Sequence, residues 1–128
     1  MILDTSAILA VVFKEPGFEL VLDKIAAADV VAIGAPTAAE AGIVLDARLG
    51  SVGRGALIRL LHEWAVSVVP FGEAHWKHAA DAYARFGRGH HKAALNFGDC
   101  LSYAVAKVAD QPLLCVGSDF SKTDLLLA

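Results

Sequence analysis

The sequence has few cysteines and no pattern that would bind zinc or build a disulfide framework. Its two cysteines, Cys100 and Cys115, lie in apolar stretches, with no Cys-x-x-Cys pair or histidine-rich segment beside them. Disulfide-rich domains and structural zinc sites both need several cysteines or histidines at close spacing. We therefore expect both cysteines to be core residues.

The sequence also lacks a long hydrophobic run, although its mean hydropathy of +0.54 is high. The most apolar region, residues 25–45, is interrupted by Asp29, Pro36 and Glu40, whereas a membrane-spanning helix needs about 18 or more apolar residues in a row. Asp4 interrupts the apolar start and no basic residue precedes it, which argues against a signal peptide. We expect a cytoplasmic protein whose apolar excess is partly covered by a partner.

An excess of either charge is likewise small. Eleven Lys and Arg against 14 Asp and Glu give a formal net charge of −3, which by itself does not indicate a nucleic-acid binder. With 128 residues, 56% of them hydrophobic and 20% charged, the chain has enough apolar material for a packed core and too little polarity for disorder. We expect a single domain over residues 1–128.

Short apolar runs rich in β-branched residues alternate with longer helical patterns. The runs predict strands at 1–3, 30–33, 66–69 and 113–116. The helical patterns predict helices at 6–13 (with Thr5 or Ser6 as N-cap), 18–28, 37–48, 52–64, 73–86 and 96–109. Continuous apolar strands separated by helices are typical of a buried parallel sheet. The sequence therefore predicts a three-layer α/β/α sandwich with a mainly parallel central sheet.

Four acidic residues lie where such a fold brings side chains to one edge of the sheet. Asp4 follows the first predicted strand and Asp119 follows the last, while Glu40 and Asp99 lie in the first turns of helices. Ligand sites in open α/β sheets lie beyond the carboxyl ends of the strands. Gathered carboxylates repel one another, and Mg²⁺ or Mn²⁺ relieves that repulsion because hard cations prefer oxygen ligands.

Each acid also has a purely structural explanation. Thr37 and Glu40 have the spacing of a capping box. The negative charge of Asp99 near a helix start interacts favourably with the helix dipole, and Asp119 is a residue type common in turns. Asp4 is the hardest to explain in this way, because it interrupts an apolar run at the end of a strand. The coincidence of all four favours a metal site.

Four segments in a fixed order carry a family resemblance. They are Ile2-Leu3-Asp4-Thr5-Ser6-Ala7, Thr37-Ala38-Ala39-Glu40, Asn96-Phe97-Gly98-Asp99-Cys100 and Leu113-Leu114-Cys115-Val116-Gly117-Ser118-Asp119-Phe120. Together they resemble PIN-domain nucleases, specifically the VapC-type toxins of prokaryotic toxin–antitoxin modules. In one departure, Cys115 and Gly117 replace the first two residues of the Thr-x-Asp-x-Asp-Phe motif that many members carry. Asp119 is left as its only acid, with Asp124 nearby.

The resemblance implies a PIN-like fold and a Mg²⁺-dependent endoribonuclease, in which Mn²⁺ substitutes and hydrolysis leaves a 5′-phosphate. It also implies a small antitoxin as partner, and with the apolar excess it leads us to expect a homodimer. By resemblance, the catalytic acids are Asp4, Glu40, Asp99 and Asp119, with Asp4 and Asp99 as the metal ligands and Glu40 or Asp119 as acceptor of the proton from water. The implied supporting residues are Thr5, Ser6, Asn96 and Asp124.

The densest basic patch lies between two predicted helices, just before Asn96. It contains Arg85, Arg88, His90, His91 and Lys92. A solvated loop would explain it, but an acidic site that binds a polyanion also needs cationic groups nearby. We therefore predict that these residues contact the RNA backbone.

The large aromatic residues fall at apolar helical positions. We expect Trp64, Trp76 and Phe86 to lie in the core or an interface rather than to stack on bases. Leu57, Leu60, Leu61 and Trp64 share helical spacing, so this face either packs in the core or is buried against the antitoxin.

Two alternatives to a nuclease remain. A receiver-type phosphoacceptor domain would have paired acids after the first strand and a lysine after the last, whereas this chain has a single Asp4 and no lysine in residues 113–117. A non-catalytic α/β binding module would use its acids only as helix caps. Metal-dependent RNA cleavage separates that module from the nuclease.

Overall fold

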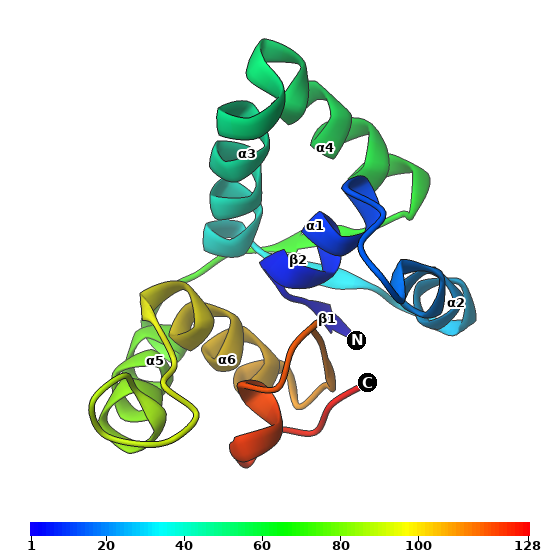
Figure 1. Ribbon diagram of the computed structural model, residues 1–128. Coiled ribbons are helices and arrows are strands. Elements are labelled where there is room, and N and C mark those ends of the chain that lie inside the picture. The colour runs from blue at the N-terminus through cyan, green and yellow to red at the C-terminus, as the bar shows by residue number, and fades with distance from the viewer.

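The computed structural model describes residues 1–128, in which two helices follow each of the first three strands (Figure 1). The elements are β1 (Ile2–Leu3), α1 (Thr5–Val12), α2 (Phe18–Ala27), β2 (Ala32–Gly34), α3 (Ala35–Leu49), α4 (Gly53–Glu63), β3 (Ser67–Val69), α5 (Glu73–Phe86), α6 (Phe97–Ala109) and β4 (Leu113–Leu114). Short 3₁₀ turns cover Gly50–Val52 and Phe120–Lys122. Every predicted element is present, and the strands are shorter than predicted.

The four strands form one parallel sheet in the order β3-β2-β1-β4. Ile2 lies opposite Ala32 and Leu113, and Leu3 lies opposite Ile33 and Leu114. Because successive residues of a strand point to opposite faces, this register gives the sheet two apolar faces.

Helices cover both faces, as the three-layer prediction requires. Figure 1 shows α5 and α6 on one side of the strands and α1, α3 and α4 on the other. Ile2, Ala32 and Leu113 pack with α5 and α6 in one core. Leu3, Ile33 and Leu114 pack in a second core with residues of α1, α2, α3 and α4. The α/β/α sandwich is confirmed.

The predicted capping interactions at two helix starts are wrong. α3 begins at Ala35 with Pro36 in its first turn, where a proline is tolerated because its missing N–H would have no helical partner. Thr37 therefore lies inside the helix, and its hydroxyl is 3.1 Å from that of Ser102, so Thr37 and Glu40 form no capping box. At α1 the N-cap is Asp4 rather than Thr5 or Ser6.

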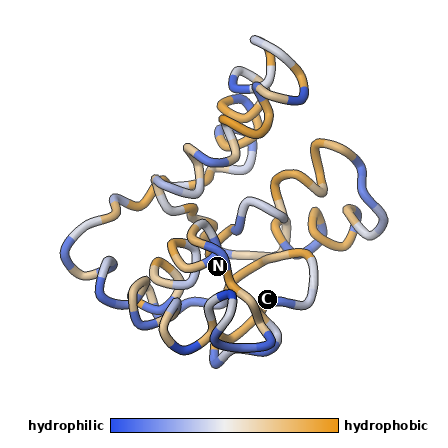
Figure 2. Tube along the Cα trace, turned by 60° about the vertical axis from the view of Figure 1, so that its left-hand side comes forward, coloured by the Kyte–Doolittle hydropathy of each residue, from blue (hydrophilic) through white to orange (hydrophobic).

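The structure shows which of the predicted core residues are buried. Cys100 is buried, Cys115 is half-buried, and both are free thiols. Leu57 is a core residue, while Leu60, Leu61 and Trp64 pack against the same core. Figure 2 shows hydrophobic stretches on the outlying helices as well as in the centre of the trace. None of the helices combines the length and apolar character that crossing a membrane requires.

Candidate active site

Asp4 lies at the carboxyl end of β1, where it caps α1. Its Oδ2 accepts hydrogen bonds from the Ser6 amide at 3.0 Å and the Ser6 hydroxyl at 2.6 Å. The Ser6 Oγ in turn accepts the Val116 amide at 2.9 Å, which joins the start of α1 to the segment after β4. Asp4 is only 5% exposed, so its carboxylate is held in place on a rigid part of the sheet edge.

Glu40 comes to the same region from α3 and contacts two other helices. Its Oε2 accepts a hydrogen bond from the Thr5 hydroxyl of α1 at 3.1 Å. On its other side it lies against Gly98 of α6, where an added methyl group would stand 2.6 Å from Oε2 and 2.9 Å from Oε1. The carboxylate can approach the α6 backbone this closely only because residue 98 has no side chain.

Asp99 lies in the first turn of α6 and closes a capping box with Asn96. The Asp99 amide donates to Asn96 Oδ1, and the Asn96 amide donates to Asp99 Oδ2, both at 2.9 Å. These bonds fix the side chain of Asp99 at the start of the helix. Asp99 therefore does cap α6, and this capping role is compatible with a second role as a metal ligand.

The pKa of Asp99 responds to the other three predicted acids. Burial is the main cause that raises this pKa to about 6, and the charges of Asp4, Asp119 and Glu40 also raise it, against the lowering effect of the hydrogen bond from the Asn96 backbone. Asp119 itself is exposed, with its carboxylate 3.9 Å from the Lys122 ammonium. The structure thus brings Asp4, Glu40 and Asp119 within electrostatic range of Asp99.

Each of the three central carboxylates has one bonded and one unbonded oxygen. Asp4 Oδ1, Glu40 Oε1 and Asp99 Oδ1 accept no hydrogen bond from the protein. No buried polar side-chain atom lacks a partner, so these oxygens are open to solvent. No three His, Cys, Asp or Glu side chains lie close enough together to hold one metal ion between them. The site is therefore an open arrangement of oxygen donors.

Asp124 lies apart from this arrangement, against α5 and α6. It accepts a hydrogen bond from the Tyr103 hydroxyl at 2.7 Å and pairs with Arg85 and Lys107, each at 3.3 Å. Burial pushes the pKa of Asp124 up, but the hydrogen bonds from Tyr103 and Lys107, together with the charges of Lys107 and Arg85, outweigh burial and hold it below its usual value. The structure places this residue in an ion-pair cluster, not with the four acids.

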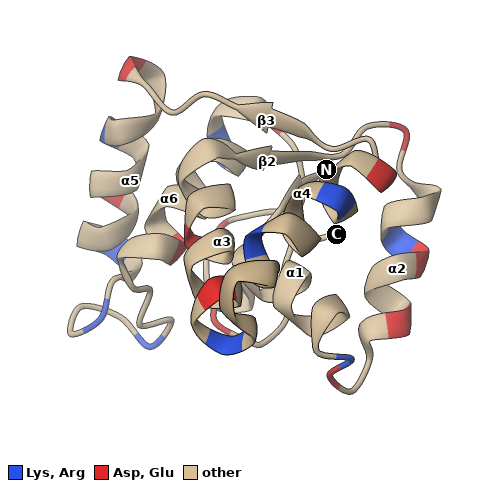
Figure 3. Cartoon of the chain, turned by 90° about the horizontal axis from the view of Figure 1, so that it is seen from above, with Lys and Arg blue, Asp and Glu red and all other residues tan.

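The residues of the predicted basic patch differ in their contacts and exposure. Arg85 is bound to Asp124, and the ring of His91 packs edge-on against Phe86 at 5.4 Å. Arg88, His90 and Lys92 are exposed. Figure 3 shows basic positions on the loop that follows α5 and acidic positions where α3 approaches α6.

The surroundings of two site residues depend on contacts that the sequence does not reveal. The resemblance implies a supporting role for Ser6, but its bridge to Val116 depends on a contact across the sheet. Gly98 is only part of a motif, and its closeness to Glu40 depends on how α3 and α6 pack. A glycine directly before a candidate metal ligand, as in Gly98-Asp99, is the one sequence feature that indicates close packing there.

Comparison with known proteins gives one consistent family. The chain matches the PIN domain family over residues 1–126. Ribonuclease VapC36 of Mycobacterium tuberculosis is 48% identical over 126 residues, which are 98% of this chain and 91% of that protein.

Solved structures agree with the fold. VapC20 of Mycobacterium tuberculosis, a toxin that cleaves the sarcin–ricin loop, has a TM-score of 0.80 at 18% identity over 99% of this chain and 97% of that chain. VapBC2 of Rickettsia felis, bound to a DNA fragment from its promoter, has a TM-score of 0.77 at 14% identity over 99% and 96%. The chain therefore belongs to the PIN-domain family and, within it, to the VapC ribonucleases.

Proposed function

We propose that this ribonuclease is the toxin of a type II toxin–antitoxin pair and hydrolyses RNA phosphodiester bonds with Mg²⁺ at Asp4 and Asp99. The observation that carries the proposal is the set of unbonded carboxylate oxygens on Asp4, Glu40 and Asp99. Membership among the ribonucleases favours catalysis over a receiver-type or non-catalytic module.

The donor set fits a hard cation. All of the donors are oxygens, as Mg²⁺ and Mn²⁺ prefer, and no histidine or cysteine thiolate is offered to zinc. Mg²⁺ keeps several water ligands and binds proteins through one or two carboxylates. An open arrangement with no closed cage is therefore compatible with Mg²⁺, and Mn²⁺ would substitute.

The protein groups have separate roles in this proposal. A bound cation would supply a water of lowered pKa and would neutralise charge on the attacked phosphate. The Ser6 hydroxyl holds the Asp4 carboxylate and the Asn96 amide holds that of Asp99, which leaves one oxygen of each carboxylate free to bind a cation. Glu40, oriented by Thr5, accepts the proton from the attacking water, with Asp119 as the alternative acceptor. The water oxygen bonds to phosphorus as the bond to the 3′ oxygen breaks, and that oxygen takes up a proton, so the products are a 5′-phosphate and a 3′-hydroxyl.

The loop after α5 supplies positive charge to the substrate. Arg88, His90 and Lys92 are exposed there, while Arg85 is engaged by Asp124. Cationic side chains that neutralise phosphates account for most sequence-independent affinity for nucleic acids. We expect these three residues to hold the RNA backbone beside the acidic site.

The antitoxin would bind the arm formed by α3 and α4. This arm stands away from the strands (Figure 1), and it exposes Ile43 at 71%, Val52 at 65% and Ile58 at 63%. Several exposed apolar side chains on an outlying element are typical of a protein–protein interface. These residues replace Leu57, which is buried, as the candidates on this arm.

A homodimer belongs to the same proposal. Strand β3 pairs only with β2, so its other edge is unpaired, and its Val68 is 53% exposed. Unpaired strand edges and exposed apolar side chains are surfaces that a second copy commonly covers.

The experiment is cleavage of RNA by purified variants in Mg²⁺. Asp4→Asn and Asp99→Asn should each fold and lose cleavage by about 10²-fold or more, because each removes a charged ligand. Asp23→Asn, at an exposed position of α2, is the control and should cleave like wild type. Near wild-type cleavage by either site variant would overturn the site assignment.

A further inference from the structure

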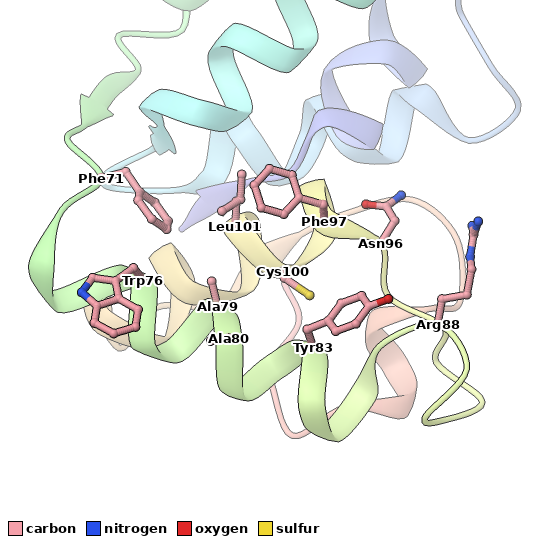
Figure 4. Close-up of a pocket in the computed structure, with 10 residues that line it drawn as sticks. All are labelled: Phe71, Trp76, Ala79, Ala80, Tyr83, Arg88, Asn96, Phe97, Cys100 and Leu101. Atoms are coloured by element: carbon pink, nitrogen blue, oxygen red, sulfur yellow. The ribbon is translucent and has the colours of Figure 1, made fainter.

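A pocket of 660 Å³ opens between α5 and α6 beside the acidic site (Figure 4). Four aromatic side chains line it, Phe71, Trp76, Tyr83 and Phe97. Phe97 is 77% exposed and Trp76 is 51% exposed, so neither is a core residue. The volume lies within the range of about 300–1,000 Å³ that small-molecule sites occupy.

The pocket has an apolar end and a polar end. Figure 4 shows Phe71 and Trp76 at one end, and Asn96 and Arg88 at the other. Arg88 forms no ion pair in the structure. Asn96 accepts the Asp99 amide with its Oδ1, and its side-chain NH₂ donates to no protein group. The polar end therefore offers a cation and unused hydrogen-bond donors.

One helical turn joins this pocket to the acidic site. Asn96 lines the pocket and caps the helix that carries Asp99. Between these two residues, Phe97 lines the pocket and Gly98 lies against Glu40. An RNA with one phosphate at the acidic site would therefore have its neighbouring nucleotide within reach of the aromatic rings of the pocket.

We propose that this pocket binds an unpaired base of the RNA, next to the phosphate that is cut; the inference rests on the RNA hydrolysis proposed above. Aromatic rings stack on any base, the Asn96 NH₂ can donate to an acceptor on the base edge, and Arg88 can neutralise the adjoining phosphate. A base inside a duplex is already stacked and paired, so the pocket selects single-stranded or looped RNA. A purely apolar partner would leave Arg88 and the Asn96 donors unmatched.

Fluorescence locates the base directly. Trp64→Phe leaves Trp76 as the only tryptophan, since the chain has two. The probe is a short unstructured RNA of mixed sequence, added in EDTA so that no metal-dependent cleavage occurs. Saturable quenching of Trp76 is expected, with much weaker quenching by the same RNA annealed to its complement. No quenching by the single strand, or equal quenching by both forms, would overturn the inference.

A matched variant series then measures the contribution of stacking. Phe97→Ala should raise the Kd for the single-stranded probe by about fivefold or more, and Phe97→Tyr should restore it because the ring returns. Leu126→Ala, which truncates a side chain that is 70% exposed elsewhere, should bind like wild type.

Two outcomes separate this inference from its rival and from the proposed function. Light scattering that shows Phe97→Ala monomeric, with unchanged RNA affinity, would assign the pocket to self-association and overturn base binding. A wild-type protein that binds the probe and quenches Trp76 but fails to cleave RNA in Mg²⁺ would refute the proposed hydrolysis while supporting the base pocket.

Discussion

Gly98 is the residue at which a single added carbon would disturb the acidic site most directly. In Gly98→Ala the new methyl group would stand 2.6 Å from Glu40 Oε2, and the flexible end of Glu40 would move away from it. The fold should hold, because alanine is favoured over glycine in a helix by about 1 kcal/mol. RNA cleavage should nevertheless fall about tenfold or more, since small displacements of a catalytic group are costly.

The control for Gly98→Ala is another helical glycine with open space around it. Gly55 in α4 has only the far end of the Arg59 side chain, at 3.9 Å. Gly55→Ala should raise Tm slightly and leave cleavage unchanged. Equal activity in the two variants would show that the contact between residue 98 and Glu40 does not matter for the reaction.

Asp99 makes the stability of the metal-free protein depend on pH. Burial first, and then the charges of neighbouring acids, raise its pKa from 3.8 to about 6. The folded protein therefore binds this proton more tightly than the unfolded chain does. The resulting stabilisation is complete below about pH 4 and is lost as the pH rises through about 6.

The comparison of wild type with Asp99→Asn isolates this effect. In EDTA, the Tm of wild type should fall relative to that of Asp99→Asn between about pH 4 and 7, and the difference should then level off. Asparagine retains an oxygen that can accept the Asn96 amide, so the helix cap is preserved. A Tm difference that stays constant over this range would contradict the raised pKa.

At the scale of the elements, Glu40 tests whether α3 carries its carboxylate for stability or for chemistry. Glu40→Gln keeps an oxygen that can accept the Thr5 hydroxyl, so the contact between α1 and α3 survives. It removes one charge from a group of mutually repelling acids. We expect Tm to be unchanged or slightly raised and RNA cleavage to fall about 10²-fold.

Glu63→Gln, at an exposed position of α4, is the matched control for removal of a helical carboxylate, and it should leave both Tm and cleavage unchanged. A Glu40→Gln protein that lost Tm but still cleaved RNA would assign Glu40 to stability alone.

The elements are predictable from the sequence because each carries its own periodicity. Apolar runs locate all four strands, and the α5 pattern gives Glu73–Phe86 with both boundaries correct. The pattern of residues begins this helix at Thr37 and so leaves Pro36 outside it, whereas Pro36 lies in the first turn of α3. That one boundary shifts the predicted helix start and produces a capping box that does not exist.

For the candidate site, the grouping of the acids can be predicted from the sequence, whereas the contacts around them are harder to predict. Asp4, Glu40, Asp99 and Asp119 can be grouped because parallel strands deliver their following residues to one edge. The partners of Asp124 cannot be predicted, since Tyr103, Arg85 and Lys107 reach it from two different helices. Likewise, no periodicity distinguishes Trp76, which lines an open pocket, from an aromatic residue in the core.

At the scale of the whole molecule, the acidic site joins segments that are far apart in the sequence. Asp4 follows β1, Glu40 belongs to α3, and Asp99 belongs to α6. The unfolded chain does not hold these carboxylates together, so a divalent cation that binds at them binds the folded state alone. Such a ligand must stabilise the fold by mass action.

The size of this stabilisation follows from the linkage relation. At a free Mg²⁺ or Mn²⁺ concentration ten times Kd it is about 1.4 kcal/mol, which corresponds to a rise in Tm of roughly 4–7 °C for a chain of this size. Thermal unfolding with and without the metal measures it.

Asp99→Asn should remove most of the metal-induced shift in Tm. Asp124→Asn should lower the Tm of the metal-free protein by breaking the cluster with Tyr103 and still show the full shift. If Asp124→Asn lost the metal-induced shift and Asp99→Asn kept it, the cation would bind at the Asp124 cluster and the acidic site would need another explanation.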